Sequence, residues 1–533
     1  MVLASLAFDG SSAQAQGKGE KEAVRHLGPD VWALTGARIV VAPGRVLEKG
    51  TLVLADGRIE AVGADVPVPP GAREMALEGK TLYPGLIDTY LPRAWPEEKF
   101  PPQGGSPRDR VTPERDLSLH AFEPGLAKAH RQAGFTTALV VPSSGVIRGQ
   151  SALINLGDGG LAENLLRNRV AQHWSVESTR ERGVYGRSLM GATALVRQTV
   201  LDARWYGRAR ASESGRRIPF DRSLEALVPA LTKEQPSVFE TEGFLDSLRA
   251  GRLARELGLK LWLVGNGHEY KRLREIATLG SPILLPLAFP DAPEVGKEGN
   301  DLSVKLEDLR HWDRAPDNPA ALLDAGITVA FTTFRLAAPK DLFKHLAAAK
   351  ERGLSEERIL ASLTTVPAKL LGISKQAGTL ESGKTANLLV VEGELWQESP
   401  KILDVWIDGR RYPLRSGEAP ALDPRGEWEL TLELGDGPPP TLLLRLAGTP
   451  AELSGQVEAG PTEIGPIVLD LSSASLAGDR LEVVYDGAPV GAPGAVTLEL
   501  TIDGDAARGK GTGPSGEFGV RGKRTAGPGG GAQ

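Results

Sequence analysis

The chain of 533 residues contains no cysteine, few histidines and no long apolar run. Without cysteine it can form no disulfide bond, no zinc site built from thiolates and no cysteine nucleophile. No segment approaches the roughly 18–20 consecutive apolar residues that a membrane-spanning helix needs. The net charge of −6 also argues against a broad nucleic-acid surface, which requires clustered positive charge. We therefore expect neither a membrane span nor a nucleic-acid partner.

Histidine is scarce, and no two histidines form an HxH or HExxH pair that would place both imidazoles on one metal ion. A lone histidine is more often a structural or surface residue than a ligand. A new site assembled from His120, His130 and His173 is a minor alternative. The sequence also lacks a glycine-rich phosphate loop with its lysine, and no GxSxG motif lies between a strand and a helix.

Both ends of the chain have biased composition. The apolar run Met1–Phe8 precedes Ala13-Gln14-Ala15, which resembles the second half of a secretory signal with its cleavage site. This pattern favours a periplasmic or secreted protein, and the alternative of an ordinary N-terminal segment favours the cytoplasm. We expect residues 1–30 to be a truncated signal or disordered, and the Pro/Gly-rich residues 525–533 to be a disordered tail.

Periodicity divides the rest of the chain. Residues 35–63 alternate as strands do, and Asp56-Gly57 between two apolar runs predicts a hairpin turn, with a further strand over Lys80–Asp88. Short apolar runs then alternate with helical stretches, as in SVFET, FLDSLRAGRLARELG and KLWLVG from Ser237 to Gly265. Strands this apolar are buried on both faces, which indicates a parallel sheet.

Strand-like sequence returns after the helical region. The segment over 377–415 again shows strands, and residues 425–524 are all-β. In the latter, Trp428, Leu430 and Leu432 alternate with polar residues, and Val496–Asp503 does the same. Strands with one solvent-exposed face and one buried face predict an antiparallel β domain at the C-terminus.

Three motifs together are similar to the amidohydrolase superfamily. They are YPGLID at Tyr83–Asp88, AGITVAFTTF at Ala325–Phe334 and AGTLESGKTANLLVV at Ala377–Val391. The resemblance implies a (β/α)8 TIM-like barrel over residues 87–376 beside a small β-sandwich made of segments 31–86 and 377–415. It also implies a hydrolase acting on carbon–nitrogen bonds other than peptide bonds. The stretch Tyr185–Tyr206 resembles an atypical branch of the superfamily with substituted metal ligands.

The resemblance places the family's metal ligands at positions that are altered here. The family uses zinc or another divalent metal at the barrel mouth to activate water and polarise a carbonyl. Its two histidines after PGLID correspond to Tyr90 and Pro92, and its histidines on strands five and six to Glu240 and Asn266. Its catalytic aspartate after strand eight corresponds to Phe334. We therefore expect no metal and no cofactor.

Three functional hypotheses follow. The first is a pseudoenzyme with a degenerate, metal-free site that binds a small ligand, pairs with an active homologous subunit or forms a homo-oligomer. The second is an active hydrolase with a rearranged site near Asp88 and Tyr90, in which Glu240 or His268 acts as residual acid or base. The third is a binding module formed by the C-terminal β domain.

Overall fold

The structure is a computed structural model that describes most of residues 31–526. Residues 96–109, 121–123, 177–187, 213–217, 294–303, 415–422, 434–438, 450–451, 463–464, 478, 491–493 and 515 are outside the described part. The expected signal segment and residues 527–533 of the expected C-terminal tail also fall outside it, whereas Thr525 and Ala526, which were expected to be in the disordered tail, end the last strand. Among the described residues, no helix is both long and apolar enough to cross a membrane.

One sheet is composed of two chain segments. Strands β1 to β5 come from the N-terminal segment and β16 to β18 from the segment after the barrel, in the order β18-β17-β16-β5-β1-β2-β3, with β4 beside β1. The predicted turn at Asp56-Gly57 is confirmed, because both residues have positive φ between β2 and β3. The strands are β1 (Trp32–Ala42), β2 (Arg45–Ala55), β3 (Arg58–Gly63), β4 (Arg73–Ala76), β5 (Lys80–Pro84), β16 (Leu388–Glu392), β17 (Lys401–Ile407) and β18 (Arg410–Pro413).

The predicted single strand Lys80–Asp88 is instead two strands that belong to different sheets. It breaks at Gly85, between β5 and β6 (Leu86–Arg93). A Cβ on Gly85 would lie 2.3 Å from the Thr136 hydroxyl oxygen, so the backbone passes too close to β7 for any larger residue. The apolar run did not reveal this break because each half is buried by itself.

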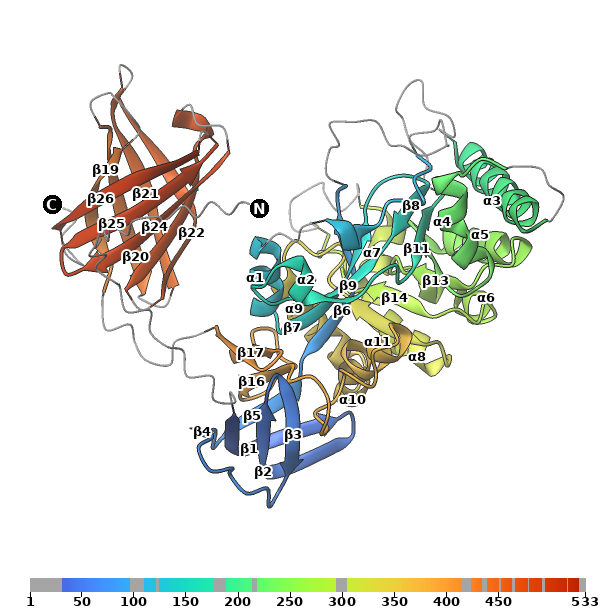
Figure 1. Cartoon of the computed structure of the whole chain (residues 1–533), viewed down its shortest axis with the longest axis horizontal. Coiled ribbons are helices and arrows are strands. Elements are labelled where there is room, and N and C mark those ends of the chain that lie inside the picture. The colour runs from blue at the N-terminus through green and yellow to red at the C-terminus, as the bar shows by residue number, and fades with distance from the viewer. Residues whose placement is uncertain are drawn as a thin grey trace, which may run out of the picture.

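In sequence, the barrel follows β5 and precedes β16, so the two segments of the sheet flank it along the chain (Figure 1). Its interior is filled by apolar side chains such as Val238, Trp262, Leu284 and Ala330. Strands and helices alternate as predicted, and the parallel strands are β6, β7 (Phe135–Pro142), β11 (Gln172–Ser175), β12 (Ser237–Glu240), β13 (Leu261–Val264), β14 (Ile283–Pro286) and β15 (Val329–Thr332).

The third position of the barrel departs from this parallel order. Strands β8 (Ile147–Gln150) and β9 (Ala152–Asn155) form one run that pairs antiparallel with β11 and β7. Only a short turn separates β7 from β8, and a parallel connection needs a crossover of a dozen or more residues. The start of β8 therefore lies at the end of the barrel where the parallel strands finish, which is the mouth.

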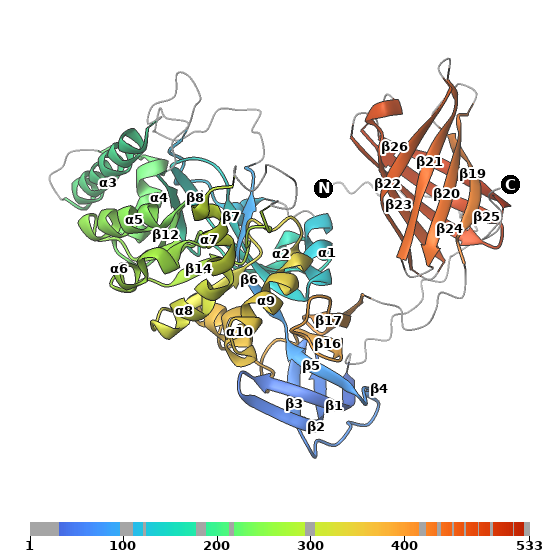
Figure 2. The same ribbon diagram turned by 180° about the vertical axis from the view of Figure 1, so that it is seen from behind.

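Helices surround the barrel on its outer side (Figures 1 and 2). The predicted helix over FLDSLRAGRLARELG is confirmed as α5, whose small and apolar residues face the barrel. The helices are α1 (Pro124–Gln132), α2 (Leu161–Asn164), α3 (Leu189–Ala211), α4 (Arg222–Leu231), α5 (Phe244–Glu256), α6 (Leu273–Ala277), α7 (Leu306–Arg314), α8 (Asn318–Asp324), α9 (Leu342–Glu351), α10 (Glu356–Leu363) and α11 (Thr365–Leu370); β10 (Leu165–Arg167) pairs with β9.

The C-terminal domain is a closed antiparallel barrel with its own core (Figure 2). The predicted alternation is confirmed: Trp428, Leu430 and Leu498 are buried, and the residues between them are more exposed. Its strands are β19 (Gly426–Glu433), β20 (Thr441–Thr449), β21 (Glu452–Thr462), β22 (Gly465–Ala477), β23 (Arg480–Asp486), β24 (Ala495–Asp503), β25 (Ala506–Gly513) and β26 (Gly516–Ala526).

Candidate functional site at the barrel mouth

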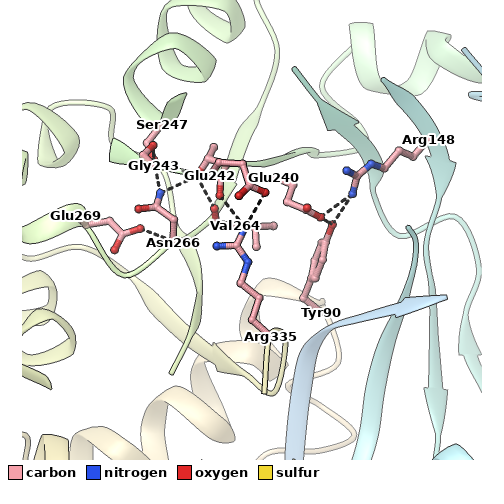
Figure 3. Close-up of polar contacts among 11 residues, drawn as sticks. Tyr90, Arg148, Glu240, Glu242, Gly243, Ser247, Val264, Asn266, Glu269 and Arg335 are labelled. Atoms are coloured by element: carbon pink, nitrogen blue, oxygen red, sulfur yellow. Dashed lines mark hydrogen bonds and ion pairs between the residues drawn. The ribbon is translucent and has the colours of Figure 1, made fainter. Parts of the chain in front are cut away.

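Three polar side chains meet at the mouth of the barrel. The Tyr90 hydroxyl donates a hydrogen bond of 2.6 Å to Glu240 Oε2, and Arg148 Nη1 donates a second bond of 2.6 Å to the same oxygen. Arg148 Nη1 also lies 3.3 Å from the Tyr90 hydroxyl. Figure 3 shows the Tyr90 and Arg148 side chains converging on the carboxylate from two different strands. The cluster joins β6, β8 and β12.

The reversed direction of β8 brings Arg148 to this place. Arg148 is the second residue of β8, so it lies at the end of the barrel where β12 finishes with Glu240. The next residue, Gly149, has a φ of +115°, and a Cβ there would lie 2.4 Å from the Arg115 carbonyl oxygen. Glycine is therefore required beside Arg148 for β8 to pass the neighbouring loop.

The cluster is almost entirely withdrawn from water. The side chain of Arg148 is 2% exposed and that of Glu240 is 12% exposed. A guanidinium stays protonated in proteins, so a permanent positive charge lies inside the mouth and is balanced by the carboxylate. Burial, together with the nearby charge of Glu240, raises the pKa of the Tyr90 phenol well above its usual value. Tyr90 is therefore a neutral donor and not a phenolate ligand.

Two of the expected ligand positions are occupied by residues without a donor atom in the side chain, Pro92 and Phe334. Pro92 continues β6 beyond Tyr90. The centroids of the Phe334 and Tyr90 rings lie 5.0 Å apart, and the Arg335 guanidinium lies 5.1 Å from the Phe334 centroid. Phe334 therefore packs against Tyr90, whose hydroxyl donates to Glu240, and it places aromatic carbon at the position that the resemblance assigns to the catalytic aspartate.

Asn266 is held by a local hydrogen-bond network. Its amide nitrogen donates to Thr241 Oγ1 at 2.9 Å and Ser247 Oγ at 3.2 Å, while its amide oxygen accepts from the His268 backbone. The backbone nitrogen of Asn266 donates to Glu269 Oε1 at 2.6 Å (Figure 3). The side-chain amide and the backbone nitrogen of Asn266 are thus engaged in shaping the loop after β13.

His268, the second proposed acid or base, lies away from the cluster. Its ring stacks on His311 of α7 with centroids 3.8 Å apart. Burial and the nearby His311 lower the pKa of His268 to about 4. Among the contacts of the described residues, none joins His268 to Tyr90 or Glu240. The structure does not bring Glu240 and His268 together as an acid–base pair.

Asp88 lies below the cluster as a fully buried structural carboxylate. It accepts hydrogen bonds from the hydroxyls of Thr332 and Thr333 and from the Tyr90 backbone nitrogen. Burial alone would raise its pKa, but hydrogen bonds from His130 and the two threonines outweigh it, and the pKa is lowered. Asp88 therefore fixes β6 against β15 as an anion and is not open to a ligand.

The three histidines of the minor alternative have separate environments. His120 packs on Trp95, and His130 bonds to Leu126 and Thr333. His173 lies inside the barrel 5.7 Å from the Tyr90 ring, and neither of its ring nitrogens has a hydrogen-bond partner among the described residues. Burial, with the nearby charge of Arg148, lowers the pKa of His173 to about 3, so its imidazole is neutral.

A cavity of about 210 Å³ opens beside the cluster. The Oε1 atom of Glu240 accepts no hydrogen bond from the described residues, whereas Oε2 accepts two. Strand β11, at the fourth position of the barrel, contributes Ser175, and this residue pairs with Glu240 in register. The cavity is lined by Ser175, Val176, Leu189, Glu240, Thr241, Glu242 and Asp246.

The donor set at the mouth does not fit the divalent metal that the family uses. Of the expected ligand positions, only Glu240 retains a charged oxygen donor, and its Oε2 is already bound to a guanidinium. A divalent ion beside Arg148 would face a like charge at close range in a desolvated site. Within the described ranges, no three histidine, aspartate or glutamate side chains are placed to share a metal ion.

Two arginines of the mouth were missed by sequence reasoning. Arg148 lies in an otherwise apolar strand, and a lone arginine there must be paired when buried, which is a readable signal. Arg335 has a φ of +68° and donates to the Thr241 carbonyl and to Glu242 Oε1 at 3.2 and 3.1 Å. Nothing in the sequence around Arg335 indicates this left-handed conformation.

Comparisons with known proteins agree with the motifs. Residues 317–412 match the model of the Amidohydrolase family. A crystal structure of an amidohydrolase from Thermotoga maritima is 23% identical, covers 72% of this chain and 99% of its own, and superposes with a TM-score of 0.60. A structure of a putative prolidase from Bifidobacterium longum is 14% identical, covers 72% and 94%, and has a TM-score of 0.41. No curated protein matches the chain in sequence.

The superposition establishes the fold, and the family match adds sequence similarity around β15 and β16. The motif at Ala377–Val391 lies within the range that the family model matches. Residues 317–412 are therefore similar in sequence to the Amidohydrolase family, and the chain shares the fold of an amidohydrolase.

Proposed function

We propose that the barrel mouth is a metal-independent binding site for a small ligand, in a superfamily member that has lost metal-dependent hydrolysis. The observation that supports this best is the contact of 2.6 Å between Arg148 and Glu240. Arg148 is a permanent cation at the mouth that belongs to the chain itself, and it lies beside the carboxylate at the end of β12.

The chemistry of the remaining groups supports the same proposal. Hydrolysis in this superfamily relies on a metal to activate water and to polarise the scissile carbonyl. Glu240 accepts two hydrogen bonds on one oxygen, and the Tyr90 phenol stays protonated because its pKa is raised. His173 is neutral and buried. These groups can bind and orient a polar molecule, but they offer no strong electrophile.

The cavity supplies the place for a ligand. Glu240 Oε1 accepts no hydrogen bond from the described residues, and Val176 and Leu189 provide apolar walls. Mouth loops of this fold carry the binding residues, so a ligand here uses the same place as a substrate would in related enzymes. The pseudoenzyme could act alone or beside an active homologous subunit, and size measurement with light scattering distinguishes these states.

Metal analysis of the full-length protein tests the proposal. The protein is incubated with zinc, manganese or iron, dialysed, and assayed for bound metal by mass spectrometry. We expect less than about one tenth of an equivalent, because Arg148 repels a divalent ion from Glu240. The matched variant Arg148→Ala removes that charge and is expected to retain more zinc than the parent.

Retention of one equivalent of zinc by the parent protein, with turnover of an amide or cyclic amide that chelator abolishes, would contradict the proposal. That outcome would favour the active hydrolase with a rearranged site. The hypothesis that the C-terminal barrel is the binding module has less support, because its inner face is packed with buried apolar side chains.

A further inference from the structure

A second and larger cavity lies at the opposite end of the barrel from the mouth. Its volume is about 590 Å³, within the range of small-molecule pockets. Gln235 stands just before β12, whose other end carries Glu240, and Gln150 ends β8, whose start carries Arg148. The cavity is lined by Glu114, Gln150, Arg169, Phe220, Arg222, Glu225, Ala226, Val228, Pro229, Glu234 and Gln235.

The amide of Gln235 is held in one orientation at the inner wall. Its Nε2 donates to the Arg169 carbonyl at 2.8 Å and to Gln150 Oε1 at 3.2 Å. Gln150 is itself fixed, because its own Nε2 donates to the Pro113 carbonyl at 3.3 Å. Rotating Gln235 would place two oxygens against each other. Its Oε1 is therefore an acceptor that lacks a partner within the described residues, on a side chain that is 4% exposed.

Both signs of charge surround this acceptor. Arg169 uses Nε to bind Asp116 at 2.7 Å, which leaves its two terminal nitrogens for another acceptor. Arg169 also has a φ of +47°, a strained backbone that recurs at binding sites. Arg222 has no ion pair with the residues that the structure describes. Negative charge comes from Glu225 of α4, which lies 4.0 Å from Arg210, and from Glu234 after the helix.

The outer wall is apolar. Phe220 is 66% exposed, and Arg210 lies 5.6 Å from its ring centroid. Val228 and Pro229 of α4 extend this surface. An exposed phenylalanine beside a polar recess is suited to contact an apolar or aromatic group, while the charged end of a ligand reaches the arginines and glutamates.

We propose that this cavity binds an amino acid with an apolar or aromatic side chain, as a site separate from the mouth. The carboxylate would pair with Arg169 and Arg222, and the ammonium would donate to Gln235 Oε1 and to a glutamate. The side chain would lie on Phe220, Val228 and Pro229. A zwitterion is the ligand class that uses both signs of charge and the apolar wall together. The inference does not depend on the function of the mouth.

Calorimetric titration of the full-length protein tests this with three probes. They are L-phenylalanine, 2-phenylethylamine, which lacks the carboxylate, and 3-phenylpropionate, which lacks the ammonium. We expect saturable binding of L-phenylalanine and at least tenfold weaker binding of each single-charge analogue. Equal binding of an analogue, or no binding of L-phenylalanine, would overturn the proposal.

Variants locate the site. Arg222→Ala and Phe220→Ala change exposed side chains and should fold normally, and each is expected to weaken L-phenylalanine binding at least tenfold. Arg252→Ala removes an exposed arginine of α5 outside the cavity and should leave affinity within twofold. Glu242→Ala changes the mouth and should do the same. Loss of binding in Glu242→Ala with normal binding in Arg222→Ala would place the ligand at the mouth and contradict the inference.

Discussion

Arg148 carries a charge that cannot be removed by deprotonation, and Glu240 pairs with it inside the barrel. Removing one partner of such a pair leaves the other charge buried and uncompensated, whereas replacing both with apolar groups costs far less. We therefore expect substitution of one partner to destabilise the fold more than substitution of both partners. This difference between single and double variants distinguishes an ion pair from a side chain that stabilises the fold by packing alone.

We predict that Arg148→Met lowers the free energy of unfolding by about 3–5 kcal/mol, because Glu240 remains buried without its partner. The double variant Arg148→Met/Glu240→Leu is expected to lose at least about 2 kcal/mol less than the single variant. Urea unfolding followed by tryptophan fluorescence measures both. Arg252→Ala, on an exposed face, should change the value by less than about 0.5 kcal/mol. A double variant less stable than the single one would contradict this account.

His173 makes stability depend on pH. Burial lowers the pKa of His173 to about 3, whereas the unfolded chain has the ordinary value near 6.5. Below pH 6.5 the unfolded state therefore binds a proton that the folded state does not, and stability falls as the pH falls. Between pH 6.5 and 5 the parent should lose about 2 kcal/mol more than His173→Phe, which keeps a ring but does not titrate. Denaturant midpoints at the two pH values measure the difference, and equal losses would refute it.

Among the elements, the junction of β5 and β6 leaves no room for a side chain at Gly85. We predict that Gly85→Ala destabilises the protein by about 1–3 kcal/mol, because the new Cβ would overlap the buried side chain of Thr136. Thr136→Ala in the same chain should restore part of the loss. Gly125→Ala in α1, where no atom lies within 4 Å of the new Cβ, is the matched control and should be neutral. Thermal unfolding monitored by circular dichroism distinguishes these outcomes.

The elements that sequence predicted well are those with simple periodicity. Alternating burial identified β24, and helical spacing identified α5. The reversal at β8 was not predicted, because an apolar strand reads the same in either direction and only the short turn before it carries the signal. The substituted ligand positions at Tyr90 and Phe334 followed from the motifs. The position of Arg148 at the mouth could not be predicted from the motifs, because it depends on the direction of β8.

For the whole molecule, the C-terminal barrel has a core separate from that of the rest of the chain. We predict that calorimetry of the full-length protein shows two unfolding transitions. A chain of residues 425–526 produced alone should retain one of them at the same temperature, because a closed barrel leaves no unpaired strand edge. A single transition in the full chain, or an unfolded isolated barrel, would show that the two cores are energetically coupled.

The pairing of β5 with β16 joins Pro84 to Leu388 across the entire barrel sequence. During synthesis, the backbone amide and carbonyl groups on that side of β5 have no strand partner until the barrel and β16 have been translated. Chains released early would carry this unsatisfied edge into a crowded cell, where it can recruit another copy. Completion of translation thus acts as the last step in closing the first sheet, and truncation anywhere before β16 should yield aggregates in place of a smaller soluble protein.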